Sequence, residues 1–316
     1  MKEYRHSFEW NGAFFIFTKK TAGKHPLIMY SCFPARIGYK KEAIMRLLKL
    51  LVLLIILAGS GAAIWMYYPY YQISTLKKQT SAHSQDGSMS SYIDHFKESD
   101  TEQLHLLALG DSVIAGYGAS EADSLVGKFA DGLARQTSKT VVSKNEGING
   151  LTSERLNSLI QSGVINDEIS SANIIMINVG GNDILRAARD SDFGSAIKTF
   201  DRLQSDFTEN LAGITEGIRY LNPNATIIFL ELYNPLPTDH SFYSLSDKLL
   251  PKWNVHLYKA AQQFDYAVVV HTTKVIHSSK PDHLSPDGVH PSLDGYEAIS
   301  QQALEQFASE PWSEGK

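Results

Sequence analysis

The hydrophobic residues of this chain follow two different patterns, one continuous and one periodic. From Leu50 to Leu76 the sequence contains no charged residue, and Leu50–Met66 is almost wholly apolar. From Leu104 to about Phe307, short apolar runs alternate with longer amphipathic stretches. Because about 20 apolar residues are enough for a helix to cross a bilayer, the first pattern predicts a transmembrane helix. The second pattern predicts a globular domain that contains both strands and helices.

The periodic part of the chain predicts strands and helices in alternation. Apolar and β-branched runs predict strands over residues 104–109, 140–144, 174–179, 226–232 and 267–271. Helical periodicity predicts helices over residues 125–135, 153–161, 196–221, 247–264 and 293–307. This alternation favours an α/β fold with a mainly parallel sheet covered by helices on both faces. About two hundred residues suffice for one such core.

The residues that flank the continuous apolar segment indicate a membrane anchor and its orientation. The preceding residues include the basic Arg36, Lys40, Lys41, Arg46 and Lys49. Basic residues favour the cytoplasmic side, so we expect the globular domain on the outside of a bacterial cell membrane. The following residues include Trp65, Tyr67, Tyr68, Tyr70 and Tyr71, types enriched at membrane–water interfaces. We expect an uncleaved anchor over residues 45–71. Cleavage at the small residues Ser60-Gly61-Ala62, which would give a secreted protein, is the alternative.

The remaining segments complete the predicted organisation. Residues 72–103 are polar, which predicts a flexible linker before a globular domain over 104–310 and a tail over 311–316. Residues 1–44 show no sustained periodicity, and we hypothesise that they are an untranslated leader with Met45 as the start. Met45-Arg46-Leu47-Leu48-Lys49 is a conventional basic opening, and codons for Lys41-Glu42-Ala43 can spell a bacterial ribosome-binding sequence. A short cytoplasmic segment is the alternative, and N-terminal sequencing of the native protein distinguishes the two.

Charge and cysteine content exclude several classes of function. The chain has a net charge of −5, and residues 104–316 alone carry −10. Nucleic-acid binding requires a basic surface, so we expect no nucleic-acid partner. The single cysteine, Cys32, excludes a disulfide within the chain and a cysteine-based metal cluster.

Four short blocks carry the candidate chemistry. They are Gly110-Asp111-Ser112-Val113, Gly147-Ile148-Asn149-Gly150, Gly180-Gly181-Asn182-Asp183 and Asp287-Gly288-Val289-His290. The first three follow predicted strands, and the fourth lies in the loop before the last predicted helix. Because ligands bind beyond the carboxyl ends of the strands in open α/β sheets, we expect all four blocks to converge there.

Three residues in the first and last blocks have the chemistry of a nucleophile and its base. Ser112 is the candidate nucleophile, and a serine hydroxyl needs a neighbouring base to take its proton. His290 is the candidate base, since imidazole exchanges protons near neutral pH. Asp287 precedes it in a loop that can fold the carboxylate back onto the ring. A helix N-cap is the structural alternative for Ser112, and a surface or core histidine for His290.

The second and third blocks supply candidate donors to an oxyanion. A glycine such as Gly150 allows its backbone N–H to approach a substrate closely, and the side-chain amide of Asn182 donates directly. The backbone N–H of Ser112 is a third candidate. Gly147 is a rival to Gly150, and a cap or turn residue is the alternative for Asn182. Asp111 and Asp183 fit structural caps better than reacting acids.

A metal site is the competing interpretation of the histidine-rich C-terminal region. Its ligands would be His277, His283, His290 and Asp287. These residues lack the spacing of a recognised metal motif. We therefore expect neither a metal nor a cofactor.

Together the four blocks resemble those of the SGNH, or GDSL-type, hydrolase superfamily, particularly its lysophospholipase/thioesterase-I-like branch. The resemblance covers about residues 104–307. Ser112, Gly150, Asn182 and His290 match the four residues after which the family is named, and Asp287 matches its acid. The run 145–152 looks like the family's second block, which favours Gly150 over Gly147. Val113 is a departure, because the family usually has leucine there.

This resemblance implies a flavodoxin-like three-layer α/β/α sandwich that hydrolyses esters or thioesters through an acyl-enzyme, without a metal. The implied substrate is an acyl ester. Placement at a membrane fits lipid or lysophospholipid esters, and it also fits O-acetyl groups on cell-wall carbohydrates. An acyltransferase with the same triad and a non-catalytic surface-binding module are the rival interpretations.

Overall fold

The computed structural model describes residues 4–10, 13–19, 37–82, 90–189, 193–241 and 243–312. The chain separates into two units, Met1–Trp65 and Met66–Lys316. In the first unit, β1 (Tyr4–Trp10) and β2 (Ala13–Lys19) form an antiparallel pair, where the sequence predicted no element. The residues between them in the sequence, Asn11 and Gly12, are a dipeptide strongly favoured in short hairpins.

Helix α1 (Ile37–Ala82) contains the predicted membrane segment. Its residues Ala43–Lys77 are long and apolar enough to cross a membrane, and an 18-residue window within them has a mean hydropathy of 2.5. This stretch is longer than the roughly 20 residues that a bilayer requires. The anchor predicted over 45–71 is therefore part of a longer helix, and the last turns of α1 belong to the second unit.

The second unit is built on a parallel sheet of five strands in the order β4-β3-β5-β6-β7. The strands are β3 (Gln103–Gly110), β4 (Thr140–Gly147), β5 (Ile174–Asn178), β6 (Thr226–Leu230) and β7 (Ala267–Val270). Counted within the sheet this order is 2-1-3-4-5, the flavodoxin-like arrangement. The predicted fold class is confirmed.

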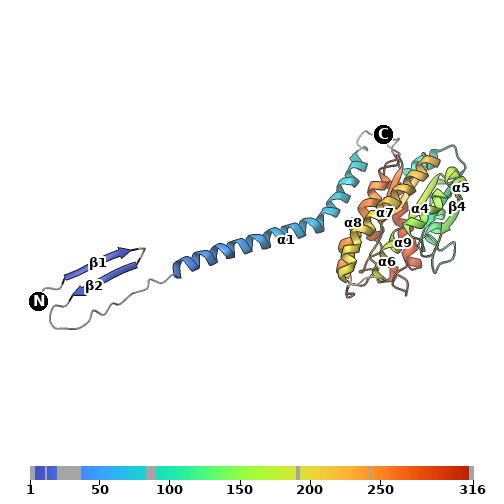
Figure 1. Cartoon of the computed structure of the whole chain (residues 1–316). Helices are drawn as coiled ribbons and strands as arrows, with labels where there is room; N and C mark the ends of the chain where they lie inside the picture. Colours follow the sequence, from blue (N-terminus) through green and yellow to red (C-terminus); the bar gives the residue numbers. More distant parts are fainter. Residues whose placement is uncertain are drawn as a thin grey trace. The chain divides into compact units, whose positions relative to one another are not determined.

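Helices cover both faces of this sheet (Figure 1). One face is covered by α2 (Tyr92–Glu98), α3 (Leu125–Thr137) and α9 (Leu293–Ser309). The other is covered by α4 (Ser153–Gln161), α5 (Asn166–Ser171), α7 (Phe193–Leu221) and α8 (Tyr243–Ala261). Side chains alternate along β3, so Leu106 and Ala108 enter the first core and Leu107 and Leu109 the second.

Two parts of the segment expected to be a flexible linker, 72–103, are helical in the structure. The last turns of α1 reach Ala82, and α2 begins at a capping box made by Ser91 and Asp94. α2 buries Tyr92, Ile93 and Phe96 against the core, and these few apolar residues are enough to hold so short a helix. The central part of the expected linker, 83–89, lies outside the described residues.

The first residues of the expected C-terminal tail also pack on the domain. Pro311 forms a β-bridge with Ser91. The indole ring of Trp312 stacks on His95, with ring centroids 3.6 Å apart, and on Tyr266 at 4.5 Å. Ring stacking of this kind holds Trp312 against α2 and Tyr266. Residues 313–316 of the tail lie outside the described residues.

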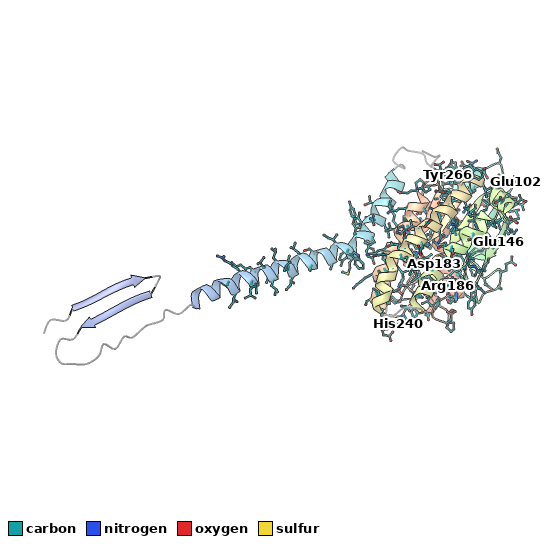
Figure 2. The ribbon with its side chains drawn as sticks, viewed as in Figure 1. Glu102, Glu146, Asp183, Arg186, His240 and Tyr266 are labelled. Carbon is teal, nitrogen blue, oxygen red and sulfur yellow. The ribbon has the colours of Figure 1, made fainter. Side chains whose placement is uncertain are left out.

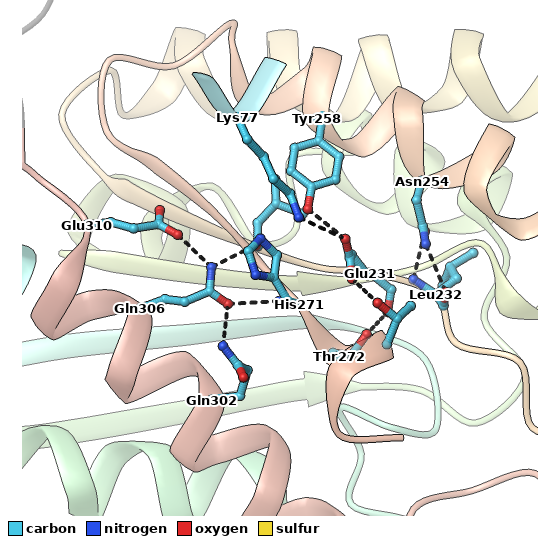
Figure 3. A network of polar contacts seen from close by, with 12 residues as sticks. Lys77, Glu231, Leu232, Asn254, Tyr258, His271, Thr272, Gln302, Gln306 and Glu310 are labelled. Atoms are coloured by element: carbon cyan, nitrogen blue, oxygen red, sulfur yellow. Dashed lines mark hydrogen bonds and ion pairs between the residues drawn. The ribbon is translucent and has the colours of Figure 1, made fainter. Parts of the chain in front are cut away.

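A polar network joins the end of α1 to the sheet (Figure 3). The buried carboxylate of Glu231, directly after β6, accepts hydrogen bonds of 2.6 Å from both Tyr258 and Thr273. Nζ of Lys77 on α1 lies 4.0 Å from the same carboxylate. Ile73 and Leu76 pack on the neighbouring core. Within the second unit, the end of α1 is thus held against the sheet by both apolar and charged contacts.

Candidate active site

Ser112 lies just after the end of β3, the strand at which the order of the strands in the sheet reverses. β4 and β5 flank β3 on opposite sides, and ligands bind beyond the carboxyl ends of the strands at such a point of reversal. β3 ends at Gly110, where a Cβ atom would stand 2.1 Å from the carbonyl oxygen of Asn178. Only glycine fits between the two strands, and the chain turns sharply there to present Ser112 at the edge of the sheet.

Asp111 stabilises this turn through hydrogen bonds of its side chain. Its buried carboxylate accepts hydrogen bonds from the N–H of Val113 (3.0 Å) and from Nδ2 of Asn178 (2.9 Å). Burial raises the pKa of Asp111 to about 6, although both hydrogen bonds act in the opposite direction. These contacts agree with the structural role expected for Asp111.

The structure brings Ser112, His290 and Asp287 together. Nε2 of His290 lies 2.8 Å from Oγ of Ser112, and Nδ1 lies 2.6 Å from Oδ2 of Asp287. With a proton on Nδ1, the imidazole donates to the carboxylate and its free Nε2 accepts the serine O–H. This is the arrangement that a histidine needs to remove the hydroxyl proton.

The loop before α9 fixes the carboxylate of Asp287. Its Oδ1 accepts hydrogen bonds from Oγ of Ser285 (2.6 Å) and from the backbone N–H groups of Val289 (2.9 Å) and His290 (3.0 Å). Burial acts to raise the pKa of Asp287, but these hydrogen bonds and that from the His290 ring outweigh it and bring the pKa well below its usual range. The Tyr233 hydroxyl donates to the carbonyl of Val289 (2.9 Å) and holds the other side of the loop.

The ring of Tyr117 covers one face of His290. The two ring centroids are 4.2 Å apart and the planes differ by 28°. Tyr117 is fixed through its backbone, since its N–H donates to the carbonyl of Ser112 (3.0 Å) and its carbonyl accepts from the Tyr296 hydroxyl (3.1 Å). The aromatic ring thus shields one face of the imidazole.

The two candidate glycines of the second block differ in their surroundings. The N–H of Gly147 donates to Oδ1 of Asn145 (2.9 Å), and a Cβ there would meet the backbone N of Ala115 at 2.2 Å. Gly147 is therefore required for close packing. Gly150 has a φ of +75°, and among the described residues no atom outside Gly150 and its two chain neighbours lies within 4 Å of an added Cβ. This open, left-handed position suits a glycine whose backbone faces a substrate.

The third block begins α6 (Gly181–Arg189), a helix that the sequence did not predict. Gly181 stands beside Asp111, since a Cβ at Gly181 would lie 3.7 Å from its Oδ2. The next residue, Asn182, uses Nδ2 to donate to the carbonyl of Leu151 (3.0 Å). Asp183 accepts from the N–H (3.0 Å) and Oγ (2.6 Å) of Ser153, the first residue of α4, and this agrees with the structural cap role expected for Asp183.

Two of the four residues of the alternative metal site make other contacts in the structure. Nδ1 of His283 lies 2.7 Å from the carbonyl of Val275, and His290 contacts Ser112 and Asp287. Within the described part of the chain, no three His, Cys, Asp or Glu side chains are grouped as metal ligands.

Sequence reasoning missed several residues that support this site. Asn178 is the one polar side chain in the otherwise apolar run 174–179, and a polar residue at the end of a buried strand is a usable signal. Tyr117 lies between two glycines five positions after Ser112, which marks an exposed turn. Arg186 donates from Nη2 to the carbonyl of Gly150 (3.1 Å), a contact without any sequence signal.

Comparison with known proteins identifies the family. Residues 108–298 match the model of the GDSL-like lipase/acylhydrolase family. The chain belongs to this family. It is 28% identical over 208 residues to the spore germination lipase LipC of Bacillus licheniformis, covering 63% of this chain and 94% of LipC. It is 26% identical over 212 residues to YpmR of Bacillus subtilis, covering 66% of this chain and 83% of YpmR.

A solved structure of the family has the same fold. The lipase Lip_vut3 from a goat rumen metagenome superposes with a TM-score of 0.58 and 26% sequence identity. The match covers 66% of this chain and 98% of Lip_vut3. Family membership and this likeness support a hydrolase of the esterase and lipase type.

Proposed function

We propose that this hydrolase cleaves carboxylic esters or thioesters through an acyl-enzyme formed on Ser112. Oγ of Ser112 bonds to the carbonyl carbon while Nε2 of His290 takes the hydroxyl proton, and the carbonyl electron pair moves onto oxygen. The tetrahedral intermediate collapses, the bond to the leaving group breaks, and that group receives the proton from His290. Water then attacks the acyl-enzyme, with His290 again as base, and releases the acid.

The observation that carries this proposal is the continuous contact from Asp287 through His290 to Ser112, at 2.6 and 2.8 Å. Asp287 orients the imidazole and stabilises its protonated form. The low pKa of Asp287 supports this role, because the carboxylate remains charged over the working pH range.

We assign the oxyanion hole to the backbone N–H groups of Ser112 and Gly150 and the side-chain amide of Asn182. The N–H of Gly147 is already donated to Asn145, which favours Gly150. One N–H of the Asn182 side-chain amide donates to the carbonyl of Leu151. The second N–H of the same nitrogen is the one that we assign to the developing oxyanion.

Lipid acyl esters, lysophospholipids among them, are the substrates that we propose. The side chains of Tyr117 and Ile148 are 47% and 38% exposed beside His290 and in the second block, so apolar surface borders the site. We further propose that α1 holds the protein in a bacterial cell membrane as a single span. The part of the second unit that contains the sheet and the candidate site, called the hydrolase unit below, would then lie on the outer side. Protease added to intact cells would then digest that unit.

The direct test is the Ser112→Ala variant assayed on a chain-length series of p-nitrophenyl esters. We expect wild-type protein to prefer medium or long acyl chains and Ser112→Ala to lose ester hydrolysis. Retention of most activity by Ser112→Ala would overturn the mechanism. Cleavage of acetyl esters alone would replace the lipid substrate with carbohydrate O-acetyl groups. Transfer of the acyl group to an added sugar acceptor would identify an acyltransferase.

A further inference from the structure

Helix α6 connects the two halves of the proposed oxyanion hole. Gly150 lies in the loop after β4, whereas Asn182 lies in the first turn of α6 after β5, so the two proposed donors come from segments on opposite sides of β3. Their N–H groups must nevertheless point to one oxygen atom. A donor displaced by about 0.5–1 Å loses much of its effect on a transition state. Some contact must therefore fix the position of Gly150 relative to Asn182.

Three side chains of α6 make that contact. Asn182 donates to the carbonyl of Leu151, Asp183 accepts from the N–H and Oγ of Ser153, and Arg186 donates to the carbonyl of Gly150. Asp183 and Arg186 lie about one turn apart on α6 (Figure 2). The helix that begins with one proposed oxyanion donor thus holds the segment 150–153 that contains the other.

Arg186 is the member of this set that acts on Gly150 itself. Gly147 is held by close packing against Ala115, but Gly150 has open space on the side where a Cβ would point. Packing on that side does not restrain Gly150, and its φ of +75° belongs to a residue with few conformational restrictions. The bond from the Arg186 guanidinium, 3.1 Å long and strengthened by its permanent charge, supplies the missing restraint.

We propose that Arg186 is a positioning residue that holds Gly150 in the orientation required of an oxyanion donor. The inference rests on the proposed function, because it concerns the same oxyanion. Arg186 itself touches neither the nucleophile nor the base in this structure. Its effect therefore falls on the rate of the chemical step and leaves ground-state binding of the ester unchanged.

The test compares Arg186→Ala and Arg186→Lys with the wild-type, full-length protein on a p-nitrophenyl ester. We expect Arg186→Ala to lower kcat by about 10-fold with KM within 2-fold, a smaller loss than the roughly 10²–10³ for removal of a direct donor. Lysine can also donate to the Gly150 carbonyl, so Arg186→Lys is expected to recover part of kcat. Arg219→Ala is the matched control, since Arg219 donates to the backbone carbonyl of Gln263 (2.9 Å) away from the site.

A second measurement separates positioning from folding and from substrate binding. We expect Arg186→Ala to bind an alkyl boronic acid, which forms a tetrahedral adduct with the serine, about 10-fold more weakly, with the same thermal midpoint as Arg219→Ala. An unchanged kcat, or a higher KM at unchanged kcat, would overturn the inference. If Ser112→Ala is inactive while Arg186→Ala matches wild type, this inference alone fails. If Ser112→Ala remains active, the proposed function fails.

Discussion

Nε2 of His290 lies 2.8 Å from Oγ of Ser112, although 178 positions separate the two residues in the chain. Ser112 is placed by the end of β3, and His290 by the loop before α9. The parallel sheet brings both to its carboxyl edge, and the hydrogen bonds around Asp287 orient the ring. The fold therefore assembles the proposed catalytic residues from parts of the chain that are far apart.

Asp287→Asn tests the role of the carboxylate. An amide cannot stabilise a protonated imidazole and favours the wrong tautomer, so we expect kcat to fall by about 10²–10⁴-fold with little change in folding. Asp282→Asn, which changes an exposed carboxylate near the same loop, is the control. Steady-state kinetics near pH 7 makes the comparison. A loss of less than 10-fold in Asp287→Asn would remove Asp287 from the mechanism.

Asn182→Ala tests the proposed oxyanion donor. We expect a loss of about 10²–10³-fold in kcat, as removal of one direct donor causes in other hydrolases. Because Asn182 also holds the carbonyl of Leu151, the thermal midpoint is measured beside the kinetics. An unchanged kcat would exclude Asn182 from the oxyanion hole.

Asp111 gives the stability of the hydrolase unit a specific pH dependence. Its folded-state pKa is about 6, above the usual value of about 3.9 for the unfolded chain. The folded state therefore binds this proton more tightly than the unfolded chain does. The resulting stabilisation is fully present below about pH 4 and is lost as the pH rises through 6. We expect it to remove about 1–3 kcal/mol of unfolding free energy between pH 4 and pH 7, a loss absent in Asp111→Asn. Urea titrations at several pH values measure it, with the exposed Asp131→Asn as control. The prediction is wrong if the difference in unfolding free energy between wild type and Asp111→Asn is the same at pH 4 and pH 7.

Replacement of Lys77 tests the contact between the end of α1 and Glu231. Glu231 is buried and Lys77 is about one-third exposed, so solvent screens part of their attraction. We expect Lys77→Ala to lower stability by about 1 kcal/mol, which shifts the thermal midpoint by roughly 2–4 °C. Lys49→Ala changes a basic residue earlier in the same helix and serves as control. Equal midpoints for the two variants would show that the contact adds nothing to stability.

The sequence predicted the sheet and the blocks because strong, local signals specify both. The short, β-branched apolar run 174–179 favours a buried strand, and parallel strands place the residues that follow them at one edge. Helix α6 lacked such a signal, since it begins directly at the polar third block. The ordered parts of 72–103 were missed for a related reason: α2 is held by three apolar side chains, too few to show a period.

The choice between Gly147 and Gly150 illustrates what sequence patterns leave open. Both are glycines in one short block, and either could bring its N–H to a substrate. The family resemblance favours Gly150, but the physical difference between the two appears only in three dimensions, where Ala115 packs against Gly147 and Asn145 accepts a hydrogen bond from the N–H of Gly147. The contact from Arg186 to Gly150 likewise depends on the position of α6 relative to the loop after β4. Contacts between loops are set by the tertiary fold, and no local pattern encodes them.

Mass spectrometry after brief exposure to a fluorophosphonate is the most direct examination of Ser112 as an activated nucleophile. We expect one adduct per chain, located on the peptide that contains Ser112, with labelling strongly slowed in His290→Ala. An unlabelled Ser112 in folded wild-type protein, or equally fast labelling of His290→Ala, would contradict the mechanism proposed here.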